Sequence, residues 1–283
     1  MTVVVTGAAG LLGRHVAEAL RAAGHEVRGV DLALAPAAAP PVLRADLTQL
    51  GEAVEALAGA EAVVHAAAIP RPIGVTAAEV FRTNVLAAYN VVEATVLHGA
   101  GRLVSASSFS VLGLPFNPRP LRPRYLPIDE GHPLAPQEAY ALSKLATEEI
   151  VAAATRRSDL AAVSLRMPWI QTPATFALEV APRRGDPGIA AANLWSYIDV
   201  RDAAAAFLAA LERPLEGHAA LYITAPDTFM EEETLELVGA IFGEIELRSP
   251  LPGHTPLLDA TAAERLLGIR PVHSWRSYGE RRT

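Results

Sequence analysis

The chain of 283 residues contains no cysteine. A disulfide framework and metal sites built from thiolates are therefore excluded. The eight histidines are scattered along the chain, and none belongs to a pair with the HExxH spacing. We therefore expect neither a structural nor a catalytic metal.

Dense basic segments and long apolar runs are also missing. The net charge is −7, whereas a protein that binds a nucleic-acid backbone needs a strongly basic face. No stretch approaches the roughly 20 uninterrupted apolar residues of a membrane span. Residues 1–13 have an apolar core but lack the basic segment that precedes one in a signal peptide. We expect a cytoplasmic protein that binds neither nucleic acid nor membranes.

The composition, with 51% apolar and 19% charged residues, is typical of a globular domain. Short β-branched runs alternate with alanine-rich stretches, which predicts strands at 2–6, 26–31, 62–66, 102–105 and 161–167, and helices at 11–23, 77–98 and 139–156. This alternation indicates an α/β fold of the Rossmann type, a doubly wound parallel sheet covered on both faces. Right-handed connections then place the carboxyl ends of the strands along one edge, where ligands bind.

The second half of the chain is less regular. Residues 168–188 show no clear period, and a helix at 200–211, a strand at 221–224 and a helix near 231–242 follow. We therefore predict a large domain of residues 1–168, to which 195–225 return, and a small substrate-binding lobe of 169–194 and 226–283. Two proline-rich loops, 35–41 and 113–136, interrupt the first half, and the longer one is a candidate functional loop.

A glycine turn follows the first predicted strand, with Gly7, Gly10 and Gly13 spaced as GxxGxxG before a helix. Glycine lets a backbone approach a pyrophosphate closely, and the helix N-terminus offers free N–H groups. Tight packing of the helix on the sheet is the alternative explanation. Asp31 ends the next strand, where a carboxylate accepts hydrogen bonds from a ribose hydroxyl and repels a 2′-phosphate. The pattern favours NAD over NADP, although the nearby Arg28 leaves NADP open.

Tyr140 and Lys144 lie four residues apart in a predicted helix and therefore share one face. A free phenol has a pKa of about 10, and a neighbouring ammonium lowers it by stabilising the phenolate. Such a tyrosine can move a proton while a cofactor exchanges hydride. Lys144 is the only lysine among the 24 basic residues, and arginine is a poor substitute for a compact ammonium. We interpret the pair as functional.

Several segments together resemble the extended short-chain dehydrogenase/reductase family, in its NAD-dependent sugar epimerase/dehydratase branch. They are TGAAGLLG, the YALSK of Tyr140 and Lys144, NVLAAYNVVEA from Asn84, SASSFSVLG and WSYIDVRDAAAA. The resemblance covers nearly the whole chain. It implies an enzyme that transfers hydride between NAD and a hydroxyl of a sugar or sugar derivative, with a small-molecule substrate.

The resemblance also implies roles for single residues. Tyr140 would be the acid/base with Lys144 beside it, and Ser108 would hydrogen-bond the substrate oxygen; backbone capping is the alternative for a serine here, and it fits Ser105 better. The residues that the resemblance assigns to the cofactor are Gly7, Gly10, Leu11, Leu12, Gly13, Asp31, Asp46, Leu47, His65, Ala66, Ala67, Asn84, Ser107, Tyr140, Lys144 and Pro168.

For three of these positions, and for a neighbour, a second interpretation stays open. Asn84 either holds a water or helix in a proton path or caps a helix, and His65 is either functional or a buried, satisfied side chain. Pro168 and Trp169 either lie near the nicotinamide end or pack in the core.

Some positions depart from the family pattern. Leu112 stands where the family has a tyrosine, the loop between Ser108 and Tyr140 is long, and the C-terminal part is short. These departures argue against a nucleotide-sugar as substrate. Phe109 and Ser110 replace the acidic pair of dehydratases, which makes dehydration the least expected reaction and favours a dehydrogenase or a 4-epimerase. A reductase of a non-sugar carbonyl and a non-catalytic NAD-sensing protein are the alternatives.

Two arginine clusters provide a candidate site for an anionic group of the substrate. We predict that at least one of them binds a phosphate or carboxylate, and their members are Arg119, Arg122 and Arg124 in one and Arg183 and Arg184 in the other. The helices that contain Asn84 and Tyr140 resemble the pair that forms the family's two-fold dimer interface, so we expect a homodimer.

Overall fold

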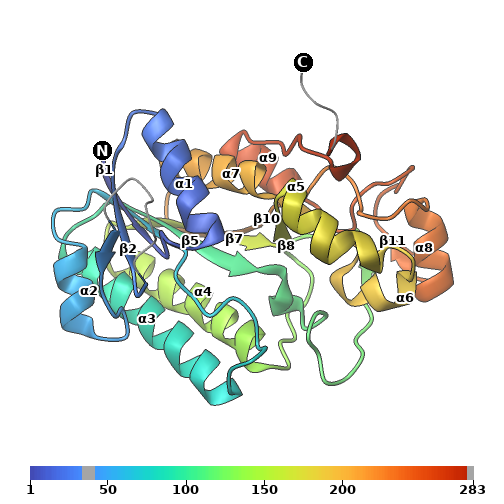
Figure 1. Cartoon of the computed structure of the whole chain (residues 1–283), viewed down its shortest axis with the longest axis horizontal. Coiled ribbons are helices and arrows are strands. Elements are labelled where there is room, and N and C mark those ends of the chain that lie inside the picture. Colours follow the sequence, from blue (N-terminus) through green and yellow to red (C-terminus); the bar gives the residue numbers. More distant parts are fainter. Residues whose placement is uncertain (34–41, 279–283) are drawn as a thin grey trace.

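A computed structural model describes residues 1–33 and 42–278. Its centre is a parallel sheet of seven strands in the order β10-β7-β5-β4-β1-β2-β3 (Figure 1). The prediction of a Rossmann-type doubly wound α/β fold is confirmed. The strands are β1 (Thr2–Thr6), β2 (Glu26–Asp31), β3 (Val42–Arg44), β4 (Ala62–His65), β5 (Arg102–Ser108), β7 (Ala161–Met167) and β10 (His218–Tyr222).

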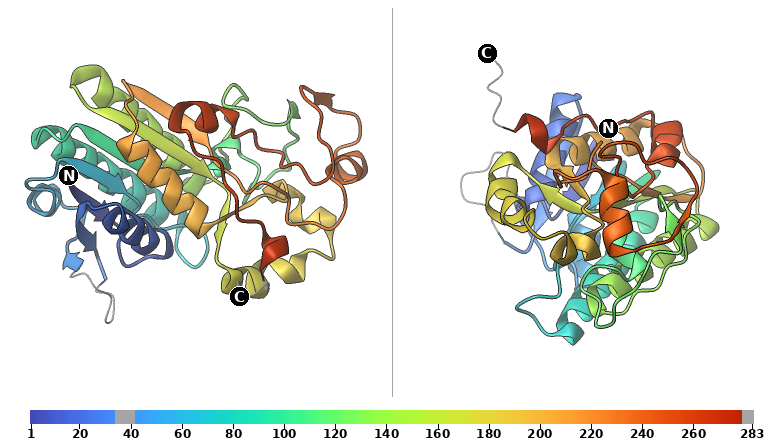
Figure 2. Two further views of the ribbon diagram at one scale, coloured as in Figure 1. Left: turned by 90° about the horizontal axis from the view of Figure 1, so that it is seen from above. Right: turned by 90° about the vertical axis from the view of Figure 1, so that its right-hand side faces the viewer.

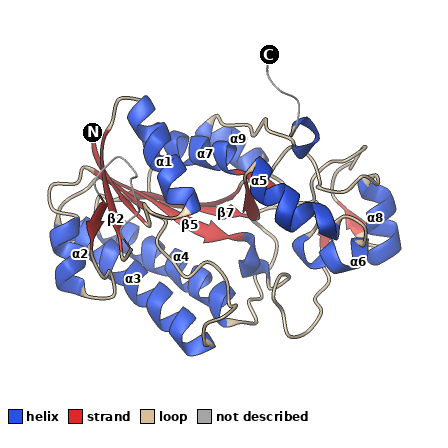
Figure 3. Ribbon diagram, in the orientation of Figure 1, coloured by secondary structure: helices blue, strands red, loops and turns tan. Residues whose placement is uncertain are grey.

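Helices cover both faces of this sheet, because its central strands are apolar on both sides. One apolar cluster joins the sheet to α1 (Leu11–Ala22), α7 (Val200–Glu212) and α9 (Thr261–Leu267). A second cluster joins the other face to α2 (Leu50–Ala56), α3 (Ala77–Leu97) and α4 (Ala139–Arg157). Figure 3 shows the two helical layers on either side of the strands.

The remaining elements extend beyond the carboxyl ends of the central strands, at the right of Figure 1 and of the left view in Figure 2. Two small parallel sheets, β11-β6 and β8-β9, lie in this part. Its elements are η1 (Phe109–Leu112), β6 (Tyr125–Leu126), β8 (Trp169–Gln171), α5 (Pro173–Thr175), η2 (Phe176–Val180), η3 (Ala181–Arg183), α6 (Pro187–Ala190), η4 (Ala191–Asn193), β9 (Tyr197–Asp199), α8 (Thr234–Ile241), β11 (Glu246–Leu247) and η5 (Trp275–Ser277).

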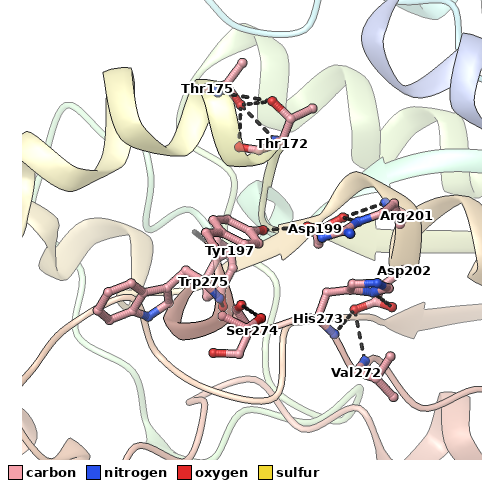
Figure 4. Close-up of polar contacts among 12 residues, drawn as sticks. Thr172, Thr175, Tyr197, Asp199, Arg201, Asp202, Val272, His273, Ser274 and Trp275 are labelled. Carbon is pink, nitrogen blue, oxygen red and sulfur yellow. Dashed lines mark hydrogen bonds and ion pairs between the residues drawn. The ribbon is translucent and has the colours of Figure 1, made fainter. Parts of the chain in front are cut away.

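The C-terminal segment ties this outer part to the sheet. The carboxylate of Asp202, near the start of α7, accepts hydrogen bonds from the backbone N–H groups of Val272 and His273 (Figure 4). Next to them the ring of Trp275 stacks on Phe176, with centroids 5.5 Å apart. The last described residues therefore fix the short helices after β8.

The structure corrects several predicted elements. The fifth strand continues to Ser108 instead of ending at 105, and β10 ends at Tyr222 instead of 224. β3 and α2 are not predicted, and the segment expected to be irregular contains β8 and a series of short helices. The predicted loop at 35–41 lies outside the described residues, whereas the loop at 113–136 contains β6.

Among the described residues, no helix combines the length and the apolar character that a bilayer span requires. In the same part of the chain, no group of three or more histidine, aspartate or glutamate side chains is arranged to hold a metal ion.

Candidate active site

The glycine turn connects β1 to α1, and its glycines differ in what they do. A Cβ on Gly7 would lie 2.7 Å from the Ala67 nitrogen, and one on Gly13 would lie 2.1 Å from the Gly7 oxygen. These two positions need glycine for close packing. A Cβ on Gly10 would meet only the Gly7 oxygen, at 3.2 Å. Gly10 is the N-cap of α1 and gives the helix no side-chain cap, so the first turn keeps N–H groups for an anion.

Asp31 ends β2 beside this turn. Its Oδ2 atom accepts a hydrogen bond from the Ala9 N–H at 3.0 Å, which holds the carboxylate next to the glycines. Asp46 follows β3, and Thr48 donates two hydrogen bonds to its Oδ1 atom, from the backbone and from the hydroxyl. Hydrogen bonding to Thr48 lowers the pKa of Asp46. Leu47 is buried, and its carbonyl accepts from the Asn90 amide at 2.9 Å.

A cavity of about 580 Å³ runs from the glycine turn to the N-terminal part of α4. Its wall contains the glycine turn, the carboxyl ends of β5 and β7 and the predicted proton-transfer residues. The predicted residues that line it are Gly7, Gly10, Leu11, Leu12, Gly13, Ala66, Ser107, Ser108, Tyr140, Lys144 and Pro168. Most of the predicted site is therefore brought together at the carboxyl edge of the sheet.

Tyr140 and Lys144 face this cavity from the first turns of α4 and are both buried. The side chain of Glu138 caps the helix by accepting hydrogen bonds from the N–H groups of Tyr140 and Ala141. The Lys144 ammonium lies 5.7 Å from the centroid of the Tyr140 ring and donates a hydrogen bond to the Ala106 carbonyl at 2.8 Å. The pair is thus positioned by the helix and by the end of β5.

Burial dominates the electrostatics of the pair. It raises the pKa of Tyr140 to about 12, although the Ser108 side chain acts in the opposite direction. Burial also lowers the pKa of Lys144 to about 8. The predicted net lowering of the phenol pKa is therefore wrong for this structure, because removing the phenolate from water costs more than the local contacts return.

Ser108 ends β5 and has two roles. Its Oγ atom accepts a hydrogen bond from the Ser110 N–H at 3.1 Å and caps η1, and the side chain also lines the cavity. Ser105 does not cap backbone; its hydroxyl shares a hydrogen bond of 2.8 Å with the Ser164 hydroxyl. The expectation that capping fits Ser105 better than Ser108 is wrong.

Residues 3–223 match the NAD dependent epimerase/dehydratase family. The chain belongs to this family. The predicted resemblance is confirmed, and so is NAD as the cofactor, since the family is NAD dependent.

Individual members resemble the whole chain. UDP-glucose 4-epimerase of Corynebacterium glutamicum is 26% identical over 97% of this chain and 92% of its own length. The 3-diazoavenalumate denitrifying reductase of a Streptomyces species is 30% identical over 96% of this chain and 89% of its own. The structure of MoeE5 in complex with UDP-glucose and NAD superimposes with a TM-score of 0.73, at 27% identity, and covers 98% of this chain and 95% of MoeE5.

The residues at the turn fit NAD. Gly10 opens toward the cavity, the start of α1 has no side-chain cap, and the Asp31 carboxylate lies beside both. The first two features suit a pyrophosphate, and the carboxylate suits ribose hydroxyls. This epimerase/dehydratase family member therefore has a cradle of the chemistry that its cofactor requires.

The other predicted cofactor residues do not line the cavity; they are Asp31, Asp46, Leu47, His65, Ala67 and Asn84. His65 is buried with Nδ1 2.9 Å from the Thr6 hydroxyl, and burial lowers its pKa to about 3, so it is a neutral, hydrogen-bonded core residue. Asn84 lies inside α3, whose N-cap is Thr76, so the capping interpretation is wrong.

The Asn84 amide instead connects two neighbouring elements. It accepts from the Ile69 N–H at 2.7 Å and donates to the Ile69 carbonyl and to the Ser143 hydroxyl, each at 3.1 Å. Asn84 thereby fixes the loop after β4 against α4 at Ser143, the residue that precedes Lys144.

Sequence reasoning missed the outer wall of the cavity. This wall is built from the loops after β4 and η1, from the end of β7, from β8 and from the short helices that follow β8. Its residues are Pro70, Arg71, Ile73, Phe116, Met167, Ile170, Thr175, Glu179 and Asn193. The signal that could have indicated them is that the segments after the carboxyl ends of parallel strands line ligand sites. Phe116 has a φ of +56° and lies edge-on to the Tyr140 ring at 6.4 Å.

The two arginine clusters have different locations. Arg183 lines the cavity, with its guanidinium 5.2 Å from the centroid of the Trp169 ring. Arg184 turns away, pairs with Glu231 and lies over Trp275. Arg119, Arg122 and Arg124 are not part of the cavity wall.

Proposed function

We propose that this family member oxidises or reduces the carbon of a hydroxyl or carbonyl group on a sugar or sugar derivative, with Tyr140 as the acid/base. One observation carries the proposal: Tyr140, Lys144 and Ser108 line the same cavity as the glycine turn. A non-catalytic protein has no need to bury a phenol and an ammonium beside its cofactor.

The proposed roles follow from these positions. Bound NAD would accept a hydride from the reacting carbon or return one to it. The N–H groups of the glycine turn would hold the pyrophosphate and Asp31 a ribose, while Ser107, Ala66 and Pro168 would contact the cofactor from the cavity wall. In this proposal Asp46, Leu47, His65, Ala67 and Asn84 shape the backbone beside the cavity.

Tyr140 moves the proton in this scheme. With its pKa raised to about 12, the phenol is protonated at neutral pH and is ready to donate to a carbonyl oxygen that is being reduced. To act as a base, it needs a cation that stabilises the phenolate. The Lys144 ammonium is within one helical turn, and with a pKa of about 8 it is mostly charged at neutral pH. Ser108 would orient the substrate oxygen next to the phenol.

The outer wall supports a polar substrate with an anionic group. Arg71, Arg183, Asn193 and Thr175 supply donors around the cavity, and Glu179 supplies an acceptor. Such a set suits hydroxyls and a carboxylate or phosphate. The relatives include a UDP-glucose 4-epimerase, which also favours a sugar.

One observation favours a second candidate, a reductase of a non-sugar carbonyl. Ile73, Phe116, Met167, Trp169 and Ile170 form an apolar part of the same wall. Apolar walls suit apolar substrates, and one relative, which matches 59% of this chain, is a 2-alkyl-3-oxoalkanoate reductase.

We also propose a cytoplasmic homodimer formed through α3 and α4. Leu86 and Tyr89 on α3 and Leu142 on α4 are exposed in the single chain. A two-fold axis would let these side chains cover one another. Light scattering tests this proposal, and a monomer mass at all concentrations would reject it.

The function is tested by a screen for NADH absorbance with sugars, uronic acids, nucleotide-sugars and apolar ketones. Net NADH from a sugar supports a dehydrogenase, a converted sugar without net NADH supports an epimerase, and turnover of a ketone alone supports the second candidate. Tyr140→Phe should lower kcat by about 10²–10⁴-fold, while Tyr89→Phe on the exposed side of α3 should not. Equal activity of Tyr140→Phe and the unmodified protein would refute the proposed role.

A further inference from the structure

A buried ion pair lies one helical turn beyond Lys144. Tyr140, Lys144 and Glu148 occupy positions i, i+4 and i+8 of α4, so they form one stripe on the helix. All three are at least nine-tenths buried. The stripe continues the predicted proton-transfer pair into the protein, away from the mouth of the cavity.

The Glu148 carboxylate is bound from two strands. Its Oε1 atom accepts from the Ser107 hydroxyl on β5 at 2.5 Å and from Arg166 Nε on β7 at 2.9 Å. Its Oε2 atom accepts from Arg166 Nη2 at 2.7 Å. Ser107 lines the cavity, and the carbonyl of its neighbour Ala106 receives the Lys144 ammonium. Glu148 therefore connects α4 to the strand end that also holds Lys144.

We propose that Glu148 is a positioning residue, which through Ser107 and Arg166 holds α4 against β5 and β7 and provides a buried negative charge one helical turn from the Lys144 ammonium beside Tyr140. The inference rests on the proposed function only for its effect on the reaction. Apolar residues of similar volume often replace a buried ion pair without loss of stability. Stability alone therefore does not explain why the Glu148–Arg166 pair is connected to the cavity through Ser107.

The surrounding charges support this assignment. Glu148 raises the pKa of Lys144 and opposes the effect of burial. His65 on β4 is a neutral core residue whose pKa is lowered by burial and by the Lys144 charge. Arg166, His218 and Tyr222 face Glu148 from β7 and β10, and Glu130 bonds the Tyr222 N–H. Glu148 thus acts on two cations: it pairs directly with Arg166, and it favours the charged form of Lys144.

Because Lys144 is the only lysine in the chain, its titration can be observed directly. The protein labelled with [¹⁵N]lysine gives one side-chain signal, whose midpoint is the pKa of Lys144. The midpoint should fall in Glu148→Gln and stay unchanged in Glu149→Gln, which removes the same charge from the exposed neighbouring position. An unchanged midpoint in Glu148→Gln would overturn the proposal.

Glu148→Gln leaves Arg166 buried without a partner, so a second variant protects the test against misfolding. Glu148→Gln combined with Arg166→Met removes the pair as a unit. Lys144 then has no carboxylate one helical turn away on α4, so its midpoint should again lie below that of the unmodified protein. If it folds and its midpoint equals that of the unmodified protein, the proposal is wrong.

The pH dependence of kcat/KM distinguishes the proposed role of Glu148 from a purely structural role. The ratio of kcat/KM in Glu148→Gln to kcat/KM in the unmodified protein is measured with a substrate from the screen. This ratio should be about tenfold lower at about pH 9 than at about pH 6, because Lys144 loses its proton at a lower pH in the variant. A loss of equal size at every pH would contradict the positioning role. A shifted midpoint in a protein that turns over no substrate would refute the proposed function and leave the assignment of Glu148 intact.

Discussion

The sheet and the outer part of this molecule are stabilised in different ways. Around the glycine turn, small residues pack backbone against backbone, as at Gly7 and Gly13, and the strands contribute apolar side chains to a cluster on each face of the sheet. The outer part depends on single side chains from distant segments, such as Trp275, which stacks on Phe176 and donates to the Thr228 carbonyl. The cofactor half thus has little freedom to vary, whereas the substrate half can change its contacts one residue at a time.

The largest effect should come from the cofactor half. In Gly13→Ala the new methyl group would lie 2.1 Å from the Gly7 carbonyl oxygen, so the turn must open. We expect a loss of about 3 kcal/mol or more in the free energy of unfolding and loss of NAD binding. Urea unfolding and NAD titration measure both.

Gly51→Ala is the matched control for this change. Gly51 lies in α2 with no atom within 4 Å of a new Cβ, so its replacement should be neutral or slightly stabilising. Normal NAD affinity in Gly13→Ala would show that the turn does not need close packing.

In the outer part, Trp275→Ala should lower the free energy of unfolding by about 2–3 kcal/mol, since the ring is only partly buried. Its removal frees Phe176, next to Thr175 in the cavity wall, so KM for substrate should rise while the Kd for NAD stays the same. Val272→Ala, an exposed position of the same segment, should change neither. Equal weakening of NAD and substrate binding would remove the distinction between the two halves.

The pH dependence of stability gives an effect in the sheet that is absent at neutral pH and grows as the pH falls. His65 has a pKa of about 3 in the folded protein, below the value near 6.5 of an unfolded chain. The unfolded state therefore takes up a proton first as the pH falls. Above pH 6.5 His65 is neutral in both states, so it does not change the free energy of unfolding with pH. Between pH 6.5 and about 3, the free energy of unfolding falls by about 1.4 kcal/mol per pH unit because of His65.

His65→Gln should remove this part of the acid destabilisation. Unfolding curves of the two proteins should have similar pH dependence above neutral pH, and the curve of the unmodified protein should be steeper below pH 6.5. Parallel curves over the whole acid range would show that His65 is not held neutral by burial.

The smallest effect concerns the substrate wall. Arg183→Gln should raise KM for an anionic substrate by about tenfold, the loss of one charge-assisted hydrogen bond, with kcat unchanged. Arg119→Gln, outside the cavity wall, should leave KM as it is. An unchanged KM after neutralising both arginine clusters would refute the predicted anionic group.

The local pattern of the sequence predicted the sheet half well, since short β-branched runs alternate there with alanine-rich helical stretches. The Tyr140–Lys144 pair was predictable from its spacing and from the single lysine. The Tyr140 pKa was not, because burial depends on the whole fold. The helices at 173–193 were missed because contacts with the distant C-terminal segment stabilise them. The two-domain division stays a prediction; Leu112 and Leu126, which it places in the large domain, pack with the outer cluster.

The central claim is that one cavity unites the glycine turn with Tyr140. A crystal structure of the protein with NAD tests it most directly. We predict that the pyrophosphate contacts the N–H groups of the glycine turn and that the nicotinamide lies in contact with the Tyr140 side chain. A dinucleotide bound elsewhere, or a nicotinamide with Tyr140 turned away from it, would contradict the account.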